Sequence, residues 1–163
     1  MLYEKFDQLI EKASDIIRDY YGSRLVSIVL FGSCSRKTQH HCSDIDLLII
    51  LSDAPKGKLS RLGEFVDHID NQLEEFVKNL SEWNIHPEIS PVIKTPKEVE
   101  NGNLLFYEMT ESCKILYDPE LFMTNFLEEM KVKIKQAGVT KTNKGYWVIP
   151  YDIFSQTTKG KHL

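Results

Sequence analysis

The first half of the chain has a hydrophobic pattern that predicts one helix followed by two buried strands. Residues 2–20 carry apolar side chains at three- to four-residue spacing, which is typical of an amphipathic helix. Two short runs rich in β-branched and leucine residues follow at 25–31 and 44–51, and each predicts a buried strand. The stretch between them, residues 32–43, is polar. A connection between the two strands is therefore expected to lie at the surface.

The second half alternates in the same way. Residues 58–83 have a long helical pattern, and residues 85–94 predict a strand that Pro87 and Pro91 confine to a sheet edge or an irregular position. Thr95, Pro96 and Glu98 form a helix-start signature. Further helices are expected at 103–111 and 120–136, with a short strand at 113–117. The order α-β-β-α-β-α-β-α predicts an α/β or α+β fold, a sheet covered by helices.

Length and composition narrow the function classes. The chain has 163 residues, about one domain, and its formal net charge of −4 argues against a broad nucleic-acid surface. No apolar stretch reaches the ~20 residues that cross a bilayer, so we expect no membrane partner. Three cysteines and the absence of a signal-peptide pattern favour reduced thiols and a cytoplasmic location. We expect one domain over residues 1–138 and a C-terminal tail over 139–163, docked by its aromatic side chains.

Two carboxylates stand at the start of the second predicted strand. Asp44 and Asp46 are two residues apart, so both side chains lie on the same face of the strand. Like charges held this close destabilise the fold unless a cation lies between them. Hard oxygen ligands of this kind suit Mg²⁺, which proteins hold with one or two carboxylates together with substrate phosphates. The pair predicts a magnesium site, and the alternative is a pair of solvated carboxylates at the sheet edge.

A glycine and a serine follow the first predicted strand. Gly32 lets the backbone turn tightly and approach a ligand, and the amides after it, with the Ser33 hydroxyl, can donate to phosphate oxygens. Arg36 and Lys37 add positive charge nearby. A second group, Cys34 with the run 40–42, contains zinc-ligand residue types, but its three consecutive members rarely converge on one ion. A mobile loop is the favoured interpretation of that run.

These motifs together resemble nucleotidyltransferases of the DNA polymerase β superfamily, and in particular the small "minimal nucleotidyltransferase" proteins. Two later stretches, 91–98 and 115–118, are also similar to those proteins. The residues that carry the main resemblance are Gly32-Ser33, Arg36 and Ser43-Asp44-Ile45-Asp46-Leu47-Leu48.

The resemblance implies a mixed sheet of about four strands flanked by helices. It implies Mg²⁺ held by Asp44, Asp46 and a third carboxylate, for which Glu88 is the candidate, with all three serving catalysis. The implied reaction is attack of a hydroxyl on the α-phosphate of a nucleoside triphosphate, ATP by default. Nucleotide binding is implied for Gly32, Ser33, Arg36 and Ser43, and the charge of Lys37 makes it a further candidate to meet a phosphate. The chain departs from the family at Glu88, where Asp is more usual, and at Lys37, where Gly often follows the arginine.

The acceptor and the partner stay open at this point. The resemblance favours an antitoxin-like protein that nucleotidylates a helical, HEPN-type toxin partner, while a homodimer would serve the same end. An RNA end or a small molecule such as an aminoglycoside is the alternative acceptor. A different class of function, a catalytically inactive nucleotide-binding or regulatory module, is motivated by the two departures at Lys37 and Glu88.

Overall fold

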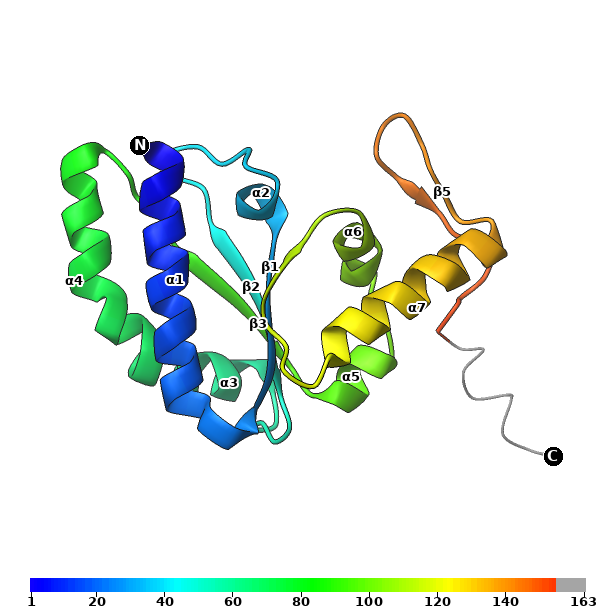
Figure 1. The fold of residues 1–163 in the computed structure, drawn as a ribbon, viewed down its shortest axis with the longest axis horizontal. Coiled ribbons are helices and arrows are strands. Elements are labelled where there is room, and N and C mark those ends of the chain that lie inside the picture. The colour runs from blue at the N-terminus through cyan, green and yellow to red at the C-terminus, as the bar shows by residue number, and fades with distance from the viewer. Residues whose placement is uncertain (155–163) are drawn as a thin grey trace.

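A mixed four-stranded sheet forms the centre of the computed structural model, which describes residues 1–154 (Figure 1). The strand order is β3-β2-β1-β4. β1 (Leu25–Phe31) pairs antiparallel with both β2 (Ile45–Leu51) and β4 (Lys114–Tyr117). β3 (Ile89–Lys94) pairs parallel with β2 and forms one edge. The fold class expected from the sequence, a mixed sheet of about four strands flanked by helices, is confirmed.

Helices cover both faces of this sheet, and each face has its own core. α1 (Leu2–Tyr21) and α4 (Asn71–Leu80) lie on one face, on the left of the sheet in Figure 1. Strand side chains alternate between the faces, so Leu47 and Ile49 pack towards these helices whereas Leu48 and Ile50 pack away from them. α3 (Lys58–Phe65) continues into α4 through a π-helical segment, η2 (Val66–Asp70). The long helix expected over 58–83 is therefore present with one irregular segment inside it.

The opposite face is covered by later elements. α5 (Pro96–Glu100), α6 (Leu105–Glu111) and α7 (Phe122–Ala137) pack there, on the right of the sheet in Figure 1. The helix start expected at Thr95 is confirmed, because the Thr95 and Glu98 side chains form a reciprocal capping box. The remaining short helical elements lie at connections: η1 (Gly22–Arg24), α2 (Gly32–Ser35) and η3 (Ser81–Trp83).

The segment after α7 packs on the second core. β5 (Thr140–Lys141) and β6 (Trp147–Val148) pair as a small two-stranded sheet. Val139 and Ile153 are buried among the side chains of α6 and α7, and the Trp147 ring lies 5.4 Å from that of Tyr107. Residues 155–163 of the predicted tail lie outside the described residues. Between residues 1 and 154, no helix has both the length and the apolar character needed to cross a membrane.

The strand predicted over residues 85–94 is shorter than expected. β3 begins only at Ile89, so the prediction is wrong for the first four residues. The backbone amide of Ile85 donates to the Leu80 carbonyl at the end of the long helix, and that of His86 donates to His41. Pro87 has no amide to donate. These bonds hold residues 85–88 as a connection, and regular pairing with β2 starts after it.

An ion pair fastens α3 to α5 beside the edge strand. The Arg61 guanidinium donates to both Glu98 carboxylate oxygens, at 2.7 and 3.1 Å, and also to the carbonyls of Pro55 and Ile93. Its side chain is only 13% exposed, whereas that of Glu98 is 40% exposed. The Arg61 hydrogen bonds outweigh the opposing effect of burial and, with those from Thr95, lower the pKa of Glu98 to about 2. The pair therefore contributes stability that is present above the ordinary carboxyl pKa.

We expect Glu98→Gln to destabilise the protein at pH 7 by about 1 kcal/mol, because the half-exposed pair is partly screened by solvent. Since the folded pKa of Glu98 lies below its unfolded value, this contribution is lost as the pH falls from the unfolded pKa through about 2. Urea unfolding at pH 7 and below pH 4 measures the difference. Glu100→Gln, an exposed change in the same helix, is the matched control. An equal loss in both variants would contradict the assignment.

Candidate functional site

The turn after β1 is built around the carboxylate of Asp46. Strand register places Phe31 opposite Asp46, so Gly32 follows directly beside it. Gly32 has φ +70°, and a Cβ atom there would lie 2.1 Å from Asp46 Oδ2, closer than two non-bonded atoms can approach. The backbone conformation and the space therefore both require glycine. The Asp46 carboxylate therefore packs against the backbone of Gly32, where α2 starts. This contact brings the Gly-Ser turn and β2 close together.

Asp44 and Asp46 interact as two like charges. Asp44 is exposed, and Asp46 is half-buried at the start of β2. Burial and then the Asp44 charge raise the pKa of Asp46, while Arg36 opposes them. A buried carboxylate repelled by its neighbour favours uptake of a cation, and two carboxylates are the donor set that Mg²⁺ commonly takes from a protein. The pair therefore fits a divalent ion.

The loop between α2 and β2 is held by short-range bonds. The Cys34 thiol donates to the Asp44 carbonyl at 3.4 Å, and burial raises the pKa of Cys34 to about 11, so it stays protonated. Ser43 is buried and its hydroxyl accepts from the His40 amide at 2.9 Å. The Ser33 carbonyl accepts from the Thr38 amide at 3.0 Å. These contacts fix the approach of the backbone to Asp44.

Arg36 and Lys37, the two cations of the predicted site, have different surroundings. Arg36 is exposed, and its charge lowers the pKa of both Asp46 and Glu108. Lys37 has φ +56°, a left-handed conformation that explains why glycine often occupies this position in the family that the motif resembles. Its ammonium contacts Asp7 of α1 at 2.6 and 2.7 Å. The structure therefore places Lys37 in an ion pair with α1.

Glu88, the candidate third carboxylate, lies on the connection that leads into β3. It precedes β3, is exposed, and its backbone carbonyl accepts from Ile45 at 2.7 Å. Glu88 and Asp44 line the same groove, while the Glu88 charge also contributes to the raised pKa of Asp70. Within residues 1–154, no three His, Cys, Asp or Glu side chains are close enough to hold one ion. The three carboxylates therefore form no compact metal-binding group among the described residues, and Glu88 as the third ligand stays a prediction.

The zinc-ligand residue types at Cys34 and residues 40–42 do not form a metal-binding group among the described residues either. Cys42 and His41 are exposed, and the His40 ring accepts from the Cys42 amide through Nδ1 at 3.3 Å. That nitrogen is therefore occupied by the loop itself. In the part of the chain that the structure describes, these side chains form no metal-binding group.

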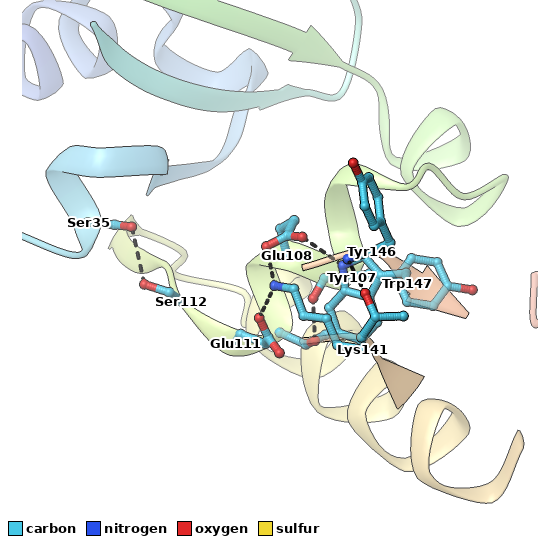
Figure 2. Close-up of polar contacts among 10 residues, drawn as sticks. Ser35, Tyr107, Glu108, Glu111, Ser112, Lys141, Tyr146 and Trp147 are labelled. Atoms are coloured by element: carbon cyan, nitrogen blue, oxygen red, sulfur yellow. Dashed lines mark hydrogen bonds and ion pairs between the residues drawn. The ribbon is translucent and has the colours of Figure 1, made fainter. Parts of the chain in front are cut away.

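A cluster of contacts that the sequence did not predict joins α6 to the β5–β6 hairpin (Figure 2). The Trp147 indole donates to Glu108 at 2.7 Å, and Lys141 contacts Glu108 at 3.0 Å and Glu111 at 2.6 Å. Burial raises the pKa of Glu108, but these bonds and the charges of Lys141 and Arg36 lower it overall.

A second contact joins the turn itself to the end of α6. The hydroxyls of Ser35 and Ser112 lie 3.4 Å apart, which ties α2 to the residue after α6 (Figure 2). Ser112 thus joins the end of α6 to α2, and Glu108 and Glu111 join α6 to the β5–β6 hairpin. These contact partners are 30 to 77 residues apart, so they arise from tertiary packing and no local sequence signal marks them.

Comparison with known proteins agrees with this geometry. The nucleotidyltransferase domain family matches residues 10–116. A Methanocaldococcus jannaschii protein named as a protein adenylyltransferase is 30% identical over 138 residues, covering 83% of this chain and 85% of its own. The structure of spectinomycin adenyltransferase AAD(9) from Enterococcus faecialis, with ATP and spectinomycin, has a TM-score of 0.53 at 15% identity, covering 80% of this chain and 65% of that one.

A toxin-antitoxin structure with AMP-PNP is also similar, with a TM-score of 0.46 and 20% identity, covering 78% of this chain and 91% of that one. The family match spans most of the sheet and includes both the Gly-Ser turn and the carboxylate pair. With the four-stranded mixed sheet and Asp46 seated against Gly32, it leads to one conclusion. The chain belongs to the nucleotidyltransferase domain family and is a nucleotidyltransferase.

Proposed function

We propose that this protein transfers an adenylyl group from ATP to a hydroxyl of a protein acceptor, with Mg²⁺ as the metal. The observation that carries the proposal is the seat of Asp46 against Gly32 with Asp44 beside it. This arrangement places an anionic pair next to a phosphate-binding turn. The name of the Methanocaldococcus jannaschii relative, protein adenylyltransferase, supports adenylyl as the group and protein as the acceptor.

Each residue at the turn has a role in this proposal. Asp44 and Asp46 would hold Mg²⁺, which neutralises phosphate charge when bound. The backbone amides after Gly32 and the Ser33 hydroxyl would bind phosphate oxygens, and Arg36 would add positive charge beside them. Ser43 supports the approach to Asp44 from its buried position. Phosphoryl-group chemistry of this kind depends on positioning and charge neutralisation, which these residues supply.

In this proposal Glu88 acts where the acceptor hydroxyl binds. Glu88 shares a groove with Asp44, which supports a role in accepting the proton of an incoming hydroxyl or in completing the metal site. Lys37 would reach a phosphate only by leaving Asp7, so its place in nucleotide binding depends on breaking that ion pair. The expected partner is a helical, HEPN-type protein, as in a toxin-antitoxin pair, or a second copy of the chain. A cytoplasmic location completes the proposal, in line with the three free cysteines.

Label transfer tests the proposal. The protein is incubated with Mg²⁺, a candidate acceptor protein, and ATP labelled at either the α- or the γ-phosphate. We expect acceptor labelling from α-labelled ATP alone, with release of pyrophosphate, and its loss on chelation of the metal. Glu88→Gln is expected to lower transfer about a hundredfold while nucleotide binding is retained, since general-base catalysis contributes about that much. Nucleotide binding with no transfer to any acceptor would favour a regulatory module instead.

A further inference from the structure

A groove of about 780 Å³ runs along the edge of the sheet from Asp44 and Glu88. Asp44 and Glu88 line one end of it. The whole of β3 follows, and Lys58 and Lys94 line the other end, where α3 begins. The two ends therefore carry opposite charges. The Gly-Ser turn lies outside this groove, so the groove is separate from the predicted phosphate-binding backbone.

The side of the groove formed by β3 offers free main-chain groups. β3 is an edge strand, so its backbone groups point alternately towards β2 and away from the sheet. The hydrogen bond from the Ile45 amide to the Glu88 carbonyl shows that the backbone groups of Glu88 point towards β2. Backbone groups of Ser90 and every second residue after it face β2, so the amide and carbonyl of Ile89 and the carbonyl of Pro91, which has no amide, face outward. Arg61 confirms this direction further along, because it donates to the Ile93 carbonyl from outside the sheet at 3.0 Å. An extended polypeptide can pair with such an edge.

The far end of the groove carries two lysines, Lys58 and Lys94. Arg61 is already paired with Glu98. Lys58 and Lys94 form no ion pair within the described residues 1–154. Two unpaired cations at one end of a groove whose other end holds Asp44 and Glu88 are complementary to a ligand with an acidic group at a fixed distance from its reacting hydroxyl.

We infer that this groove binds the acceptor as an extended polypeptide, whose hydroxyl lies at Asp44 and Glu88 and whose acidic side chain lies at Lys58 and Lys94. This inference rests on the proposed function and specifies its acceptor. Glu88 and Lys94 are six residues apart along the strand, about 20 Å at the rise of an extended chain. The acidic residue of the acceptor therefore lies about six residues from the hydroxyl that receives the adenylyl group.

A polypeptide fits the groove better than an RNA strand does. An RNA end would bring phosphates past Asp44 and Glu88, both of which line the groove and form no ion pair within residues 1–154. Mixed charge and an open sheet edge are together the features of a peptide-binding groove.

The test uses thirteen-residue peptides with a central tyrosine and one glutamate six residues away on each side, and matched peptides with lysines in place of the glutamates. The variants are Lys58→Glu/Lys94→Glu and, as a control with equal charge change, Lys12→Glu/Lys114→Glu on α1 and β4. We expect the groove variant to raise the KM for the glutamate peptide about tenfold with kcat unchanged, and the lysine peptide to regain that loss. The control is expected to behave like the unmodified protein.

Equal use of the glutamate and lysine peptides by the unmodified protein would overturn the inference, as would preferential labelling of an oligoribonucleotide 3′ end. Peptide binding followed by fluorescence anisotropy separates this inference from the proposed function. Charge-selective binding that the groove variant abolishes supports the groove even if no label is transferred. Label transfer that ignores peptide charge supports the proposed function and refutes the groove.

Discussion

Replacing Asp46 with asparagine is expected to lower nucleotidyl transfer about a thousandfold while leaving the fold at least as stable. The amide keeps the shape of the side chain against Gly32 but removes the negative charge that would hold Mg²⁺. Loss of metal-mediated charge neutralisation costs several kcal/mol of transition-state stabilisation, which corresponds to about three powers of ten in rate. Transfer of α-phosphate label from ATP measures the rate.

Asp46→Asn is expected to increase the free energy of unfolding at pH 7. Burial and Asp44 raise the pKa of Asp46 in the folded protein, so the folded state binds the proton more tightly than the unfolded chain does. Stability from this group is therefore complete below the unfolded pKa and is lost as the pH rises through the folded value. At pH 7 the ionised carboxylate destabilises the fold. Asp46→Asn removes this cost, and a higher urea midpoint at pH 7 than in the unmodified protein is expected.

Asp53→Asn provides the control for the change in net charge, because Asp53 is an exposed carboxylate in the turn after β2. It is expected to leave both transfer and stability unchanged. Mg²⁺ adds a second readout: its addition raises the thermal midpoint of the unmodified protein, and of Asp53→Asn, but not that of Asp46→Asn. Lower stability in Asp46→Asn, with transfer intact, would show that Asp46 is a structural residue.

The sequence predicted the regular parts of this fold because their signals are local. β1 and β2 are apolar runs bounded by polar turns, and the capping box at Thr95 depends on residues three apart. The connection at 85–88 was predicted wrongly, because the amides of Ile85 and His86 bond to the preceding helix and to the loop at His41. Propensity cannot show such partners, since they are chosen by tertiary contact.

In the site too, residues marked by a local motif were predicted, whereas contacts between distant segments were not. Asp44, Asp46 and Gly32 were found from spacing and resemblance, and the β1–β2 register does bring Asp46 to Gly32. The contacts of Glu108 with Lys141 and Trp147 join segments more than 30 residues apart, and no motif marks them. Charge alone suggested Lys37 as a phosphate ligand, whereas the structure pairs it with Asp7 across the start of α1. Pairing of an exposed lysine depends on which helix face lies opposite, a property of the assembled fold.

Replacing Gly32 with alanine is expected to reduce transfer about a hundredfold, because the new Cβ would lie 2.1 Å from Asp46 Oδ2 and must displace that carboxylate. A misplacement of about 1 Å at a reacting centre costs about that much in rate. Gly138→Ala is the matched control. Its φ of +66° is close to the +70° of Gly32, but nothing lies within 4 Å of the added Cβ. Both variants carry the left-handed strain of about 1 kcal/mol, and only Gly32→Ala carries the clash.

A double-mutant cycle isolates the contact between the two residues. In Asp46→Ala the carboxylate is gone, so adding Gly32→Ala there costs only the backbone strain, whereas in the unmodified protein it costs the strain and the clash. The free energies of unfolding from urea titration are therefore expected to be non-additive by about 1 kcal/mol or more, with the double variant more stable than the sum of the single effects predicts. Additive effects, together with full transfer activity in Gly32→Ala, would mean that Asp46 takes its position from β2 alone. The Gly-Ser turn would then have no part in placing the carboxylate, and the observation on which the proposed function rests would lose its force.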